Sequence, residues 1–262
     1  MRLLRWSVAL LAASALLACM PKSETARPVP TALLPSKEGS HRLVVVLPGR
    51  RDRLESMRRS GVGEAIQRVW PDTDVLFAEL SMPYYLDRSA ARRLHDEVLL
   101  PARRRAYTEI WLVGASLGGM GEILYDRMYP GQVDGMVMLA PYTGERAIHD
   151  EIRRAGGVRQ WMPAPGATNG DDWQRDLWAH LKTWSEEPER TRNVWLGYGD
   201  NDYLREGMPL LEDILPPEHV VMRPGKHAWS TWAPMTEAIF RAIDAERART
   251  GTSAPKASGT AP

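Results

Sequence analysis

Cysteine is almost absent from this chain of 262 residues, which contains Cys19 and no other. A single cysteine excludes an internal disulfide and any metal site built from several cysteines. An imbalance of charge is also absent, because 34 basic and 33 acidic side chains leave a formal net charge of +1. No strong electrostatic field therefore draws the protein toward nucleic acid, and we expect no nucleic-acid partner.

Sequence motifs for cofactors are missing too. The chain has no His-Glu-x-x-His zinc motif, no phosphate-binding glycine loop and no nucleotide fingerprint. We therefore expect neither a metal nor an organic cofactor. Hydrophobic residues make up 44% of the chain and charged residues 26%, which is typical of one sizeable globular domain of this length.

Residues 1–18 have the pattern of an export signal. Arg2 and Arg5 form a positive start, and an apolar run follows at 8–17. This run is too short to cross a bilayer as a permanent helix, so the pattern predicts a signal peptide.

The signal ends in Leu16-Leu17-Ala18-Cys19, which resembles the bacterial lipobox. The resemblance implies that Cys19 carries a lipid and becomes the first residue of the mature protein. We then expect a membrane-anchored protein on the periplasmic side of the cell envelope. An Asp directly after the lipidated cysteine would imply retention in the inner membrane. This chain has Met20 at that position, which favours the outer membrane. The alternative is an ordinary secretory signal with an incidental cysteine.

Composition divides the mature chain into three parts. Residues 19–40 are rich in proline and lack periodicity, so we predict a flexible tether. Residues 250–262 contain mainly small and polar residues, and we predict a disordered tail. The folded domain is predicted to span residues 41–249.

Within that domain, apolar runs alternate with helical patterns. We predict strands at 43–47, 74–78, 110–113, 133–139, 193–196 and 219–222, and helices at 54–69, 88–106, 117–128 and 230–246. Such alternation predicts an α/β fold, with a mostly parallel sheet of about six strands flanked by helices on both faces. Pro101 is expected to kink or split the second helix.

A Gly-x-Ser-x-Gly sequence stands between the third predicted strand and the following helix. Gly114 and Gly118 flank Ser116, and a sharp strand-to-helix turn needs small residues at both positions. The turn would hold the serine in a strained conformation and raise its hydroxyl above the sheet. We therefore predict that Ser116 is a nucleophile.

A serine hydroxyl needs a neighbouring base, and the chain has six histidines. His227 follows the last predicted strand, in a loop at the carboxyl edge of the sheet, where sites of α/β proteins gather. His41 and His219 lie at the opposite ends of their strands. The remaining three, His95, His149 and His180, fall in helical patterns and are expected at the surface.

A base of this kind needs an acid to fix its tautomer. The fifth predicted strand leads into Asp200 and Asp202, and both lie at the carboxyl edge. The strand pattern alone leaves the choice between them open.

The order Ser, Asp, His resembles that of the α/β-hydrolases. The segment Gly199-Asp200-Asn201-Asp202 resembles the family's Gly-x-x-Asp, which implies that Asp202 is the acid and Asp200 the reserve. The segment from Gly225 to Trp232 resembles the Gly-x-His stretch and following tryptophan of esterase-like members. The resemblance spans about residues 42–245 and implies an α/β-hydrolase fold lacking its first two strands.

This resemblance implies a serine hydrolase that cleaves carboxylic esters through an acyl-enzyme, with a small-molecule ester or acyl compound as substrate. The alternatives are a thioesterase, lipase, peptidase or acyltransferase with the same triad, or a non-catalytic envelope binding protein. The oxyanion donors are expected to be the backbone N–H groups of Leu117 and Arg50, with Arg51 as an alternative. Asp52 is expected to pair with one of these arginines.

A stretch without a strand pattern, about residues 143–192, is predicted to be a small helical cap insertion. It contains Trp161, Trp173, Trp178 and Trp184. These indoles are expected either to line a substrate pocket or to hold the cap together. Met82, Tyr84 and Tyr85 follow the second predicted strand and are further candidates for the pocket.

Overall fold

The structure is a computed structural model that describes residues 25, 28–105, 107–163 and 172–251. The predicted signal peptide, Cys19 and nearly all of the predicted tail lie outside the described residues. No helix in the described part of the chain combines the length and the apolar character needed to span a membrane.

The strands are β1 (Thr31–Leu34), β2 (Arg42–Leu47), β3 (Thr73–Ala78), β4 (Glu109–Ala115), β5 (Gly135–Leu139), β6 (Val194–Gly199) and β7 (Val220–Arg223). The α-helices are α2 (Leu54–Arg59), α3 (Val62–Val69), α4 (Met82–Leu86), α5 (Ala90–Leu94), α6 (Leu100–Arg103), α7 (Leu117–Met128), α8 (Arg146–Arg154), α9 (Trp173–Glu186), α10 (Met208–Glu212) and α11 (Trp229–Thr250). Shorter turns are the π-helix η1 (His95–Leu99) and the 3₁₀ helices η2 (Pro188–Thr191), η3 (Arg205–Gly207) and η4 (Pro217–His219).

The strands form one sheet in the order β1-β3-β2-β4-β5-β6-β7. All neighbouring pairs are parallel except β1 and β3, which run antiparallel. The predicted α/β fold with a mostly parallel sheet is therefore confirmed, with seven strands among the described residues instead of about six.

The additional strand, β1, falls within residues 19–40, which were predicted to form a flexible tether. Thr31 pairs with Ala78 and Leu34 with Val75, so the sheet begins ahead of residue 41. The strand has four residues and half-exposed side chains, and Pro30 and Pro35 flank it. Prolines are tolerated beside an edge strand, and so short a segment gives little hydrophobic pattern to detect.

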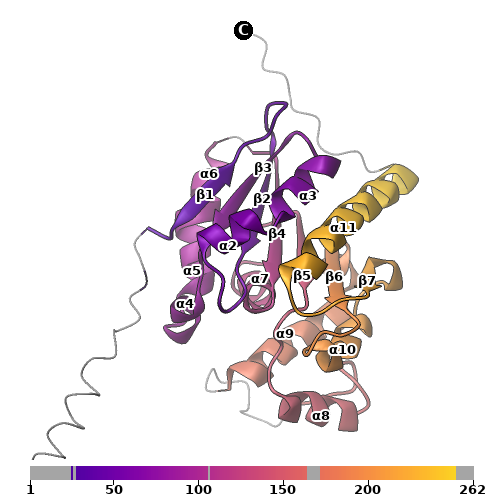
Figure 1. Cartoon of the computed structure of the whole chain (residues 1–262). Coiled ribbons are helices and arrows are strands. Elements are labelled where there is room, and N and C mark those ends of the chain that lie inside the picture. The colour runs from indigo at the N-terminus through magenta and orange to yellow at the C-terminus, as the bar shows by residue number, and fades with distance from the viewer. Residues whose placement is uncertain (1–24, 26–27, 106, 164–171, 252–262) are drawn as a thin grey trace, which may run out of the picture.

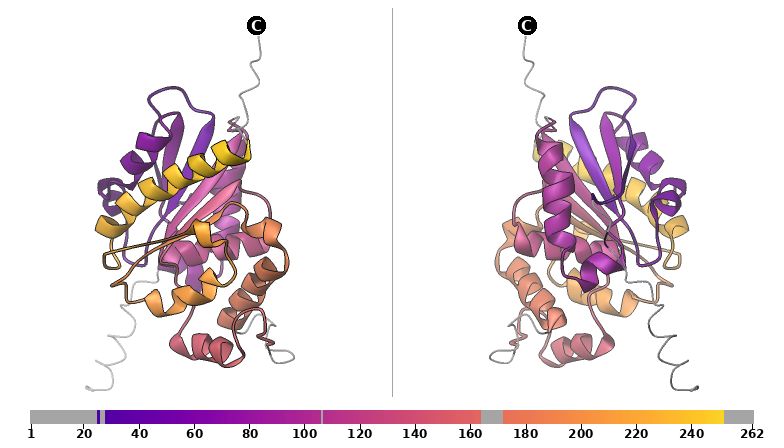
Figure 2. Two further views of the ribbon diagram at one scale, coloured as in Figure 1. Left: turned by 90° about the vertical axis from the view of Figure 1, so that its right-hand side faces the viewer. Right: turned by 90° about the vertical axis from the view of Figure 1, so that its left-hand side faces the viewer.

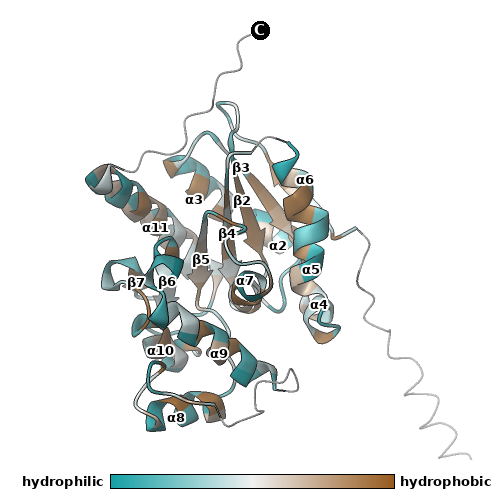
Figure 3. Cartoon of the chain, turned by 180° about the vertical axis from the view of Figure 1, so that it is seen from behind, coloured by the Kyte–Doolittle hydropathy of each residue, from teal (hydrophilic) through white to brown (hydrophobic). Residues whose placement is uncertain are grey.

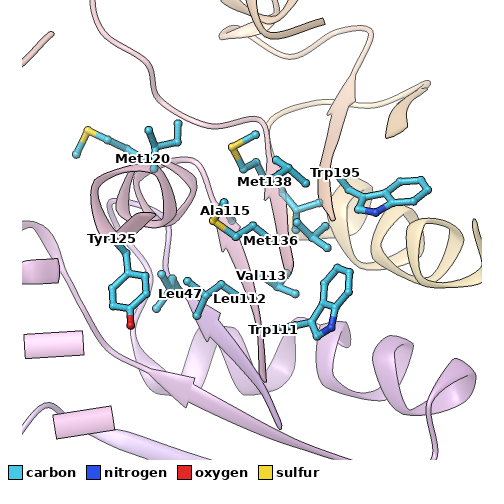
Figure 4. Packing of buried hydrophobic residues seen from close by; sticks show 14 of the residues in the cluster. Leu47, Trp111, Leu112, Val113, Ala115, Met120, Tyr125, Met136, Met138 and Trp195 are labelled. Atoms are coloured by element: carbon cyan, nitrogen blue, oxygen red, sulfur yellow. The ribbon is translucent and has the colours of Figure 1, made fainter. Parts of the chain in front are cut away.

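Helices cover both faces of the sheet. The long helix α11 lies across one face together with α3, and α5, α6 and α7 cover the other (Figure 2). Successive side chains of β4 alternate between the faces, with Trp111 on the α11 side and Leu112 on the α7 side (Figure 4). On the α11 side, Trp70 packs edge-to-face against Trp111 and Phe240, at centroid distances of 5.5 and 4.5 Å.

Strands β2–β5 are coloured mainly as hydrophobic, whereas the helices carry many hydrophilic residues (Figure 3). Strand β2 is buried from Leu43 to Leu47, as expected for a parallel strand covered on both faces. The cap helices α8 and α9, with α10, gather beyond one end of the sheet (Figure 1). That end is therefore where a site covered by the cap would form.

Two predicted helices are divided. The pattern at 54–69 forms α2 and α3, because Gly61 between them adopts a left-handed conformation with φ 78°. The pattern at 88–106 forms α5, η1 and α6. Pro101 is the second residue of α6, which follows η1 directly, so the helix changes type just ahead of this proline and does not end there.

Helix α7 carries a buried acid. Glu122 is fully buried, and neither carboxyl oxygen has a hydrogen-bond partner in the described part of the structure. Burial raises the pKa of Glu122 well above its usual range. The N–H groups of Gly114 and Val137 face the carboxyl and moderate this rise in pKa, without forming hydrogen bonds of standard geometry. Burial therefore favours the neutral form of this carboxyl in the folded protein.

We predict that Glu122→Gln stabilises the protein more at pH 8 than at pH 5. In the unfolded chain the carboxyl ionises above about pH 4.3, whereas the folded protein keeps it protonated. The free energy of unfolding of the wild type should therefore fall as the pH rises above about 4.3. Glutamine does not ionise, so the variant should not show this fall. Urea denaturation of both proteins at the two pH values measures the difference. Glu55→Gln, at an exposed position, is the control, and a gain independent of pH would contradict the prediction.

Candidate active site

Ser116 occupies the sharp turn between β4 and α7. Its backbone lies at φ 53° and ψ −108°, a conformation that residues other than glycine rarely adopt. Its N–H donates to the carbonyl of Leu139 at 2.8 Å, which fixes the turn against the end of β5. The serine is therefore held at the carboxyl edge of the sheet, at the first turn of α7.

The two flanking glycines are required by close backbone approach. A Cβ at position 114 would lie 2.4 Å from the carbonyl carbon of Gly118. A Cβ at position 118 would lie 2.6 Å from the carbonyl oxygen of Leu47. Neither position has room for a side chain, so the spacing of the motif follows directly from the packing of the turn.

Asp202 and His227 form a hydrogen-bonded pair. The Nδ1 atom of His227 lies 2.8 Å from both carboxylate oxygens of Asp202. The Asp202 side chain is fully buried, and that of His227 is 10% exposed. A carboxylate can only accept, so Nδ1 carries the proton and Nε2 is left with its lone pair. The imidazole is thus in the tautomer that a general base requires.

Asp200 has a different role in the same loop. Its Oδ1 accepts the backbone N–H of Gly225 at 3.0 Å, and its own N–H donates to the carbonyl of Arg223. These contacts join the loop after β6 to the loop that carries His227. The structure therefore pairs the histidine with Asp202, and Asp200 shapes the loop.

The predicted oxyanion donors lie beside Ser116. Residues 49–52 form a tight turn in which the N–H of Asp52 donates to the carbonyl of Gly49 at 3.1 Å. A Cβ built on Gly49 would lie 3.8 Å from the Cβ of Ser116, so this turn adjoins the serine. Arg50 occupies the second position of the turn. Leu117 is the first residue of α7, and an N–H there has no partner within its helix.

Asp52 does not form the expected ion pair with Arg50 or Arg51 in the described structure. Its carboxylate instead accepts three hydrogen bonds, from the N–H of Gly49, the hydroxyl of Ser56 and the indole N–H of Trp229. This role of Asp52 was not predicted, because Trp229 lies 177 residues further along the sequence.

Two aromatic rings contact the imidazole of His227. Trp232 packs edge-to-face against it at a centroid distance of 4.6 Å, and Tyr203 lies against it at 4.3 Å. Trp232 is buried, whereas Tyr203 is 73% exposed. Tyr203 was not predicted, and the only signal for it is its place directly after Asp202.

The other five histidines make structural contacts. His41 faces Asp72, His95 contacts the hydroxyl of Tyr125, His149 that of Thr143, His180 the carboxylate of Asp126, and His219 that of Glu246. The expectation that the three helical histidines lie at the surface is wrong for His149 and His180, whose side chains are largely buried. Each is tolerated inside because a polar partner satisfies its ring.

The cap tryptophans divide into two groups. Trp161, Trp178 and Trp184 are buried, and each indole N–H donates to a fixed acceptor: Glu151, the carbonyl of Thr143 and Asp126 respectively. Trp161 and Trp178 hold the cap together, and Trp184 ties it to α7. Trp173 is 37% exposed and adjoins Tyr142.

The candidates after β3 are also mostly structural. Tyr84 is buried, and the Tyr85 hydroxyl is buried against Gly121 of α7. Met82, at the start of α4, is partly buried as well. Two exposed aromatic side chains stand out among the described residues: Tyr203 contacts His227, and Trp173 adjoins Tyr142, whose N–H donates to the carbonyl of Ser116 at 3.0 Å.

The fold is that of the α/β-hydrolases. Est1E from Butyrivibrio proteoclasticus is similar over 84% of this chain and 94% of its own, with a TM-score of 0.56 and 17% identity. MGS-MChE2, an α/β-hydrolase enzyme from the metagenome of lagoon sediments of Mar Chica, Morocco, is similar over 87% and 100%, with a TM-score of 0.51 and 17% identity.

FphF, a fluorophosphonate-binding serine hydrolase of Staphylococcus aureus, is similar over 84% of this chain and 96% of its own, with a TM-score of 0.53 and 12% identity. No protein-family model and no curated protein sequence matches the chain. The likeness is thus one of fold.

We predict that Asp202→Asn and Asp200→Asn have very different effects on ester hydrolysis. Asparagine at 202 can stabilise the wrong histidine tautomer, and the equivalent change in a known triad lowers kcat about 10,000-fold. Asparagine at 200 can still accept the Gly225 N–H, so a loss of no more than about tenfold is expected. Steady-state kinetics of the two variants measure this contrast, and equal losses would show that Asp202 is not the acid.

Proposed function

We propose that this protein is a serine hydrolase that cleaves carboxylic esters through an acyl-enzyme. The observation that carries the proposal is the pairing of buried Asp202 with His227 at the sheet edge where the strained turn presents Ser116. The fold it shares with Est1E and FphF supports the same conclusion.

In the proposed first half-reaction, Ser116 Oγ attacks the ester carbonyl carbon while Nε2 of His227 takes its proton. The carbonyl oxygen becomes an oxyanion, which the N–H groups of Leu117 and Arg50 would stabilise. The tetrahedral intermediate collapses, the bond to the alcohol oxygen breaks, and the imidazolium returns its proton to the leaving alcohol. The buried Asp202 carboxylate stabilises the imidazolium during this step.

In the second half-reaction, water takes the place of the alcohol. His227 removes a proton from the water, which attacks the acyl carbon, and the acid leaves as Ser116 regains its hydrogen. Ser116 is 6% exposed in the folded chain, so only a carbonyl positioned from the open side of the turn can reach it. An ester presents such a carbonyl without a charge that would have to be buried.

The surroundings favour a substrate with an apolar or aryl group. The exposed rings of Tyr203 and Trp173 provide flat apolar surfaces, which suit acyl or aryl moieties. Est1E has been solved with ferulic acid, an aromatic acid, bound to it. These observations support small aryl or short acyl esters as the first compounds to test.

We predict that Ser116→Ala abolishes hydrolysis of p-nitrophenyl acetate and butyrate, with a loss of about a millionfold in kcat by analogy with known triads. A fluorophosphonate probe should label the wild type and leave the variant unlabelled. Ser40→Ala, which alters an exposed serine ahead of β2 at the opposite edge of the sheet, is the control for labelling. Wild-type rates in Ser116→Ala would refute the proposal, and an unlabelled wild type would indicate a binding protein. Product analysis with added alcohols separates hydrolysis from acyl transfer.

We also propose that the protein is anchored to the periplasmic side of the envelope, most simply the outer membrane, through a lipid on Cys19. The lipobox-like sequence supports this. In a Gram-negative host, the wild type should fractionate with membranes and incorporate labelled palmitate, whereas Cys19→Ser should do neither. Membrane association that survives the substitution would contradict the anchor.

A further inference from the structure

We propose that the Asp52 carboxylate is a positioning group, which fastens the oxyanion turn at residues 49–52 to the segment that carries His227. The inference rests on the proposed ester hydrolysis and adds a residue to it. Asp52 touches no reacting atom, so its effect on the reaction passes through the backbone that it holds.

The first half of this link closes the oxyanion turn. Oδ2 of Asp52 accepts the N–H of Gly49 at 3.0 Å, while the Asp52 N–H donates to the Gly49 carbonyl. The turn is therefore closed twice, once by backbone and once by side chain. Between these two hydrogen-bonded residues stands Arg50, whose N–H is the predicted oxyanion donor. A turn closed in this way has little freedom to tilt that N–H away from the site.

The second half of the link reaches the histidine segment. The same oxygen, Oδ2, accepts the indole N–H of Trp229 at 2.9 Å. Trp229 is the first residue of α11, two positions after His227. It packs edge-to-face on Trp232 at 5.3 Å, and Trp232 packs on His227 at 4.6 Å. One carboxylate oxygen thus joins the donor turn to the aromatic pair that borders the base.

An aspartate that merely closed a local turn would need no partner so distant in the sequence. The other carboxylate oxygen of Asp52, Oδ1, accepts the hydroxyl of Ser56 in α2 at 3.0 Å. This hydrogen bond orients Oδ2 toward Gly49 and Trp229. Hydrogen bonds to an ionised acceptor are stronger than neutral ones. Removing the carboxylate leaves a backbone N–H and an indole N–H without their acceptor at the edge of the site.

The test compares Asp52→Ala, Asp52→Asn and Trp229→Phe in steady-state ester hydrolysis and in binding of a trifluoromethyl ketone. Such a ketone forms a tetrahedral adduct with the serine, and its affinity reports on the oxyanion donors. We expect Asp52→Ala to lower kcat about 10- to 100-fold, with KM within about threefold of wild type, and to weaken the ketone in proportion.

Asp52→Asn keeps an oxygen that can accept both N–H groups, so it should recover kcat to within about threefold of wild type. Trp229→Phe keeps an aromatic ring but removes the indole N–H, and we expect it to lower kcat about fivefold. These two variants also keep the test decisive if Asp52→Ala fails to fold.

The matched control is Asp134→Ala. Asp134 also accepts a backbone N–H, that of Ile110 at 2.7 Å, but it precedes β5 at the opposite edge of the sheet. This variant should lose thermal stability with kcat unchanged. The positioning role is overturned if Asp52→Ala keeps wild-type kcat, if its ketone affinity is unchanged, or if the control loses as much rate. Ser116→Ala distinguishes the two proposals, because residual activity in that variant would refute ester hydrolysis itself.

Discussion

The structure depends on the close approach of three backbone segments at the turn between β4 and α7. The backbone of Gly118 packs against the carbonyl of Leu47, and the backbone of Gly114 packs against that of Gly118. A residue held at positive φ, as Ser116 is, costs about 1–3 kcal/mol. The surrounding sheet supplies the stabilisation that offsets it, because β2, β4 and β5 are buried on both faces. The strain is thus placed where buried strands surround it.

A parallel sheet then brings distant residues together. Because neighbouring strands run in the same direction, the segments following β2, β4, β6 and β7 all emerge at one edge. The turn at 49–52, Ser116, Asp202 and His227 come from these four segments. Asp202 is completely buried, so its charge is acceptable there only because His227 and the N–H of Leu204 provide hydrogen bonds.

Much of this arrangement could be predicted from sequence, for a physical reason. Fully buried parallel strands are continuous apolar runs, and a glycine-flanked serine between strand and helix permits few backbone conformations. The partners of Asp52 and of the cap indoles could not be predicted, since they are set by tertiary packing between residues far apart in sequence. Strand β1 was missed because four half-exposed residues between prolines carry no clear period, and the burial of His149 and His180 was missed because helical periodicity does not reveal hydrogen-bond partners.

The three buried indoles of the cap have a consequence for how firmly the cap is held. The N–H groups of Trp161 and Trp178 bond to acceptors within the cap, at Glu151 and the carbonyl of Thr143, so these two bonds would move with it. Trp184 instead bonds to Asp126 of α7, so lifting the described cap helices from α7 would break this hydrogen bond and expose a buried indole. The position of α9 beside α7 is accordingly fixed by packing in the folded chain.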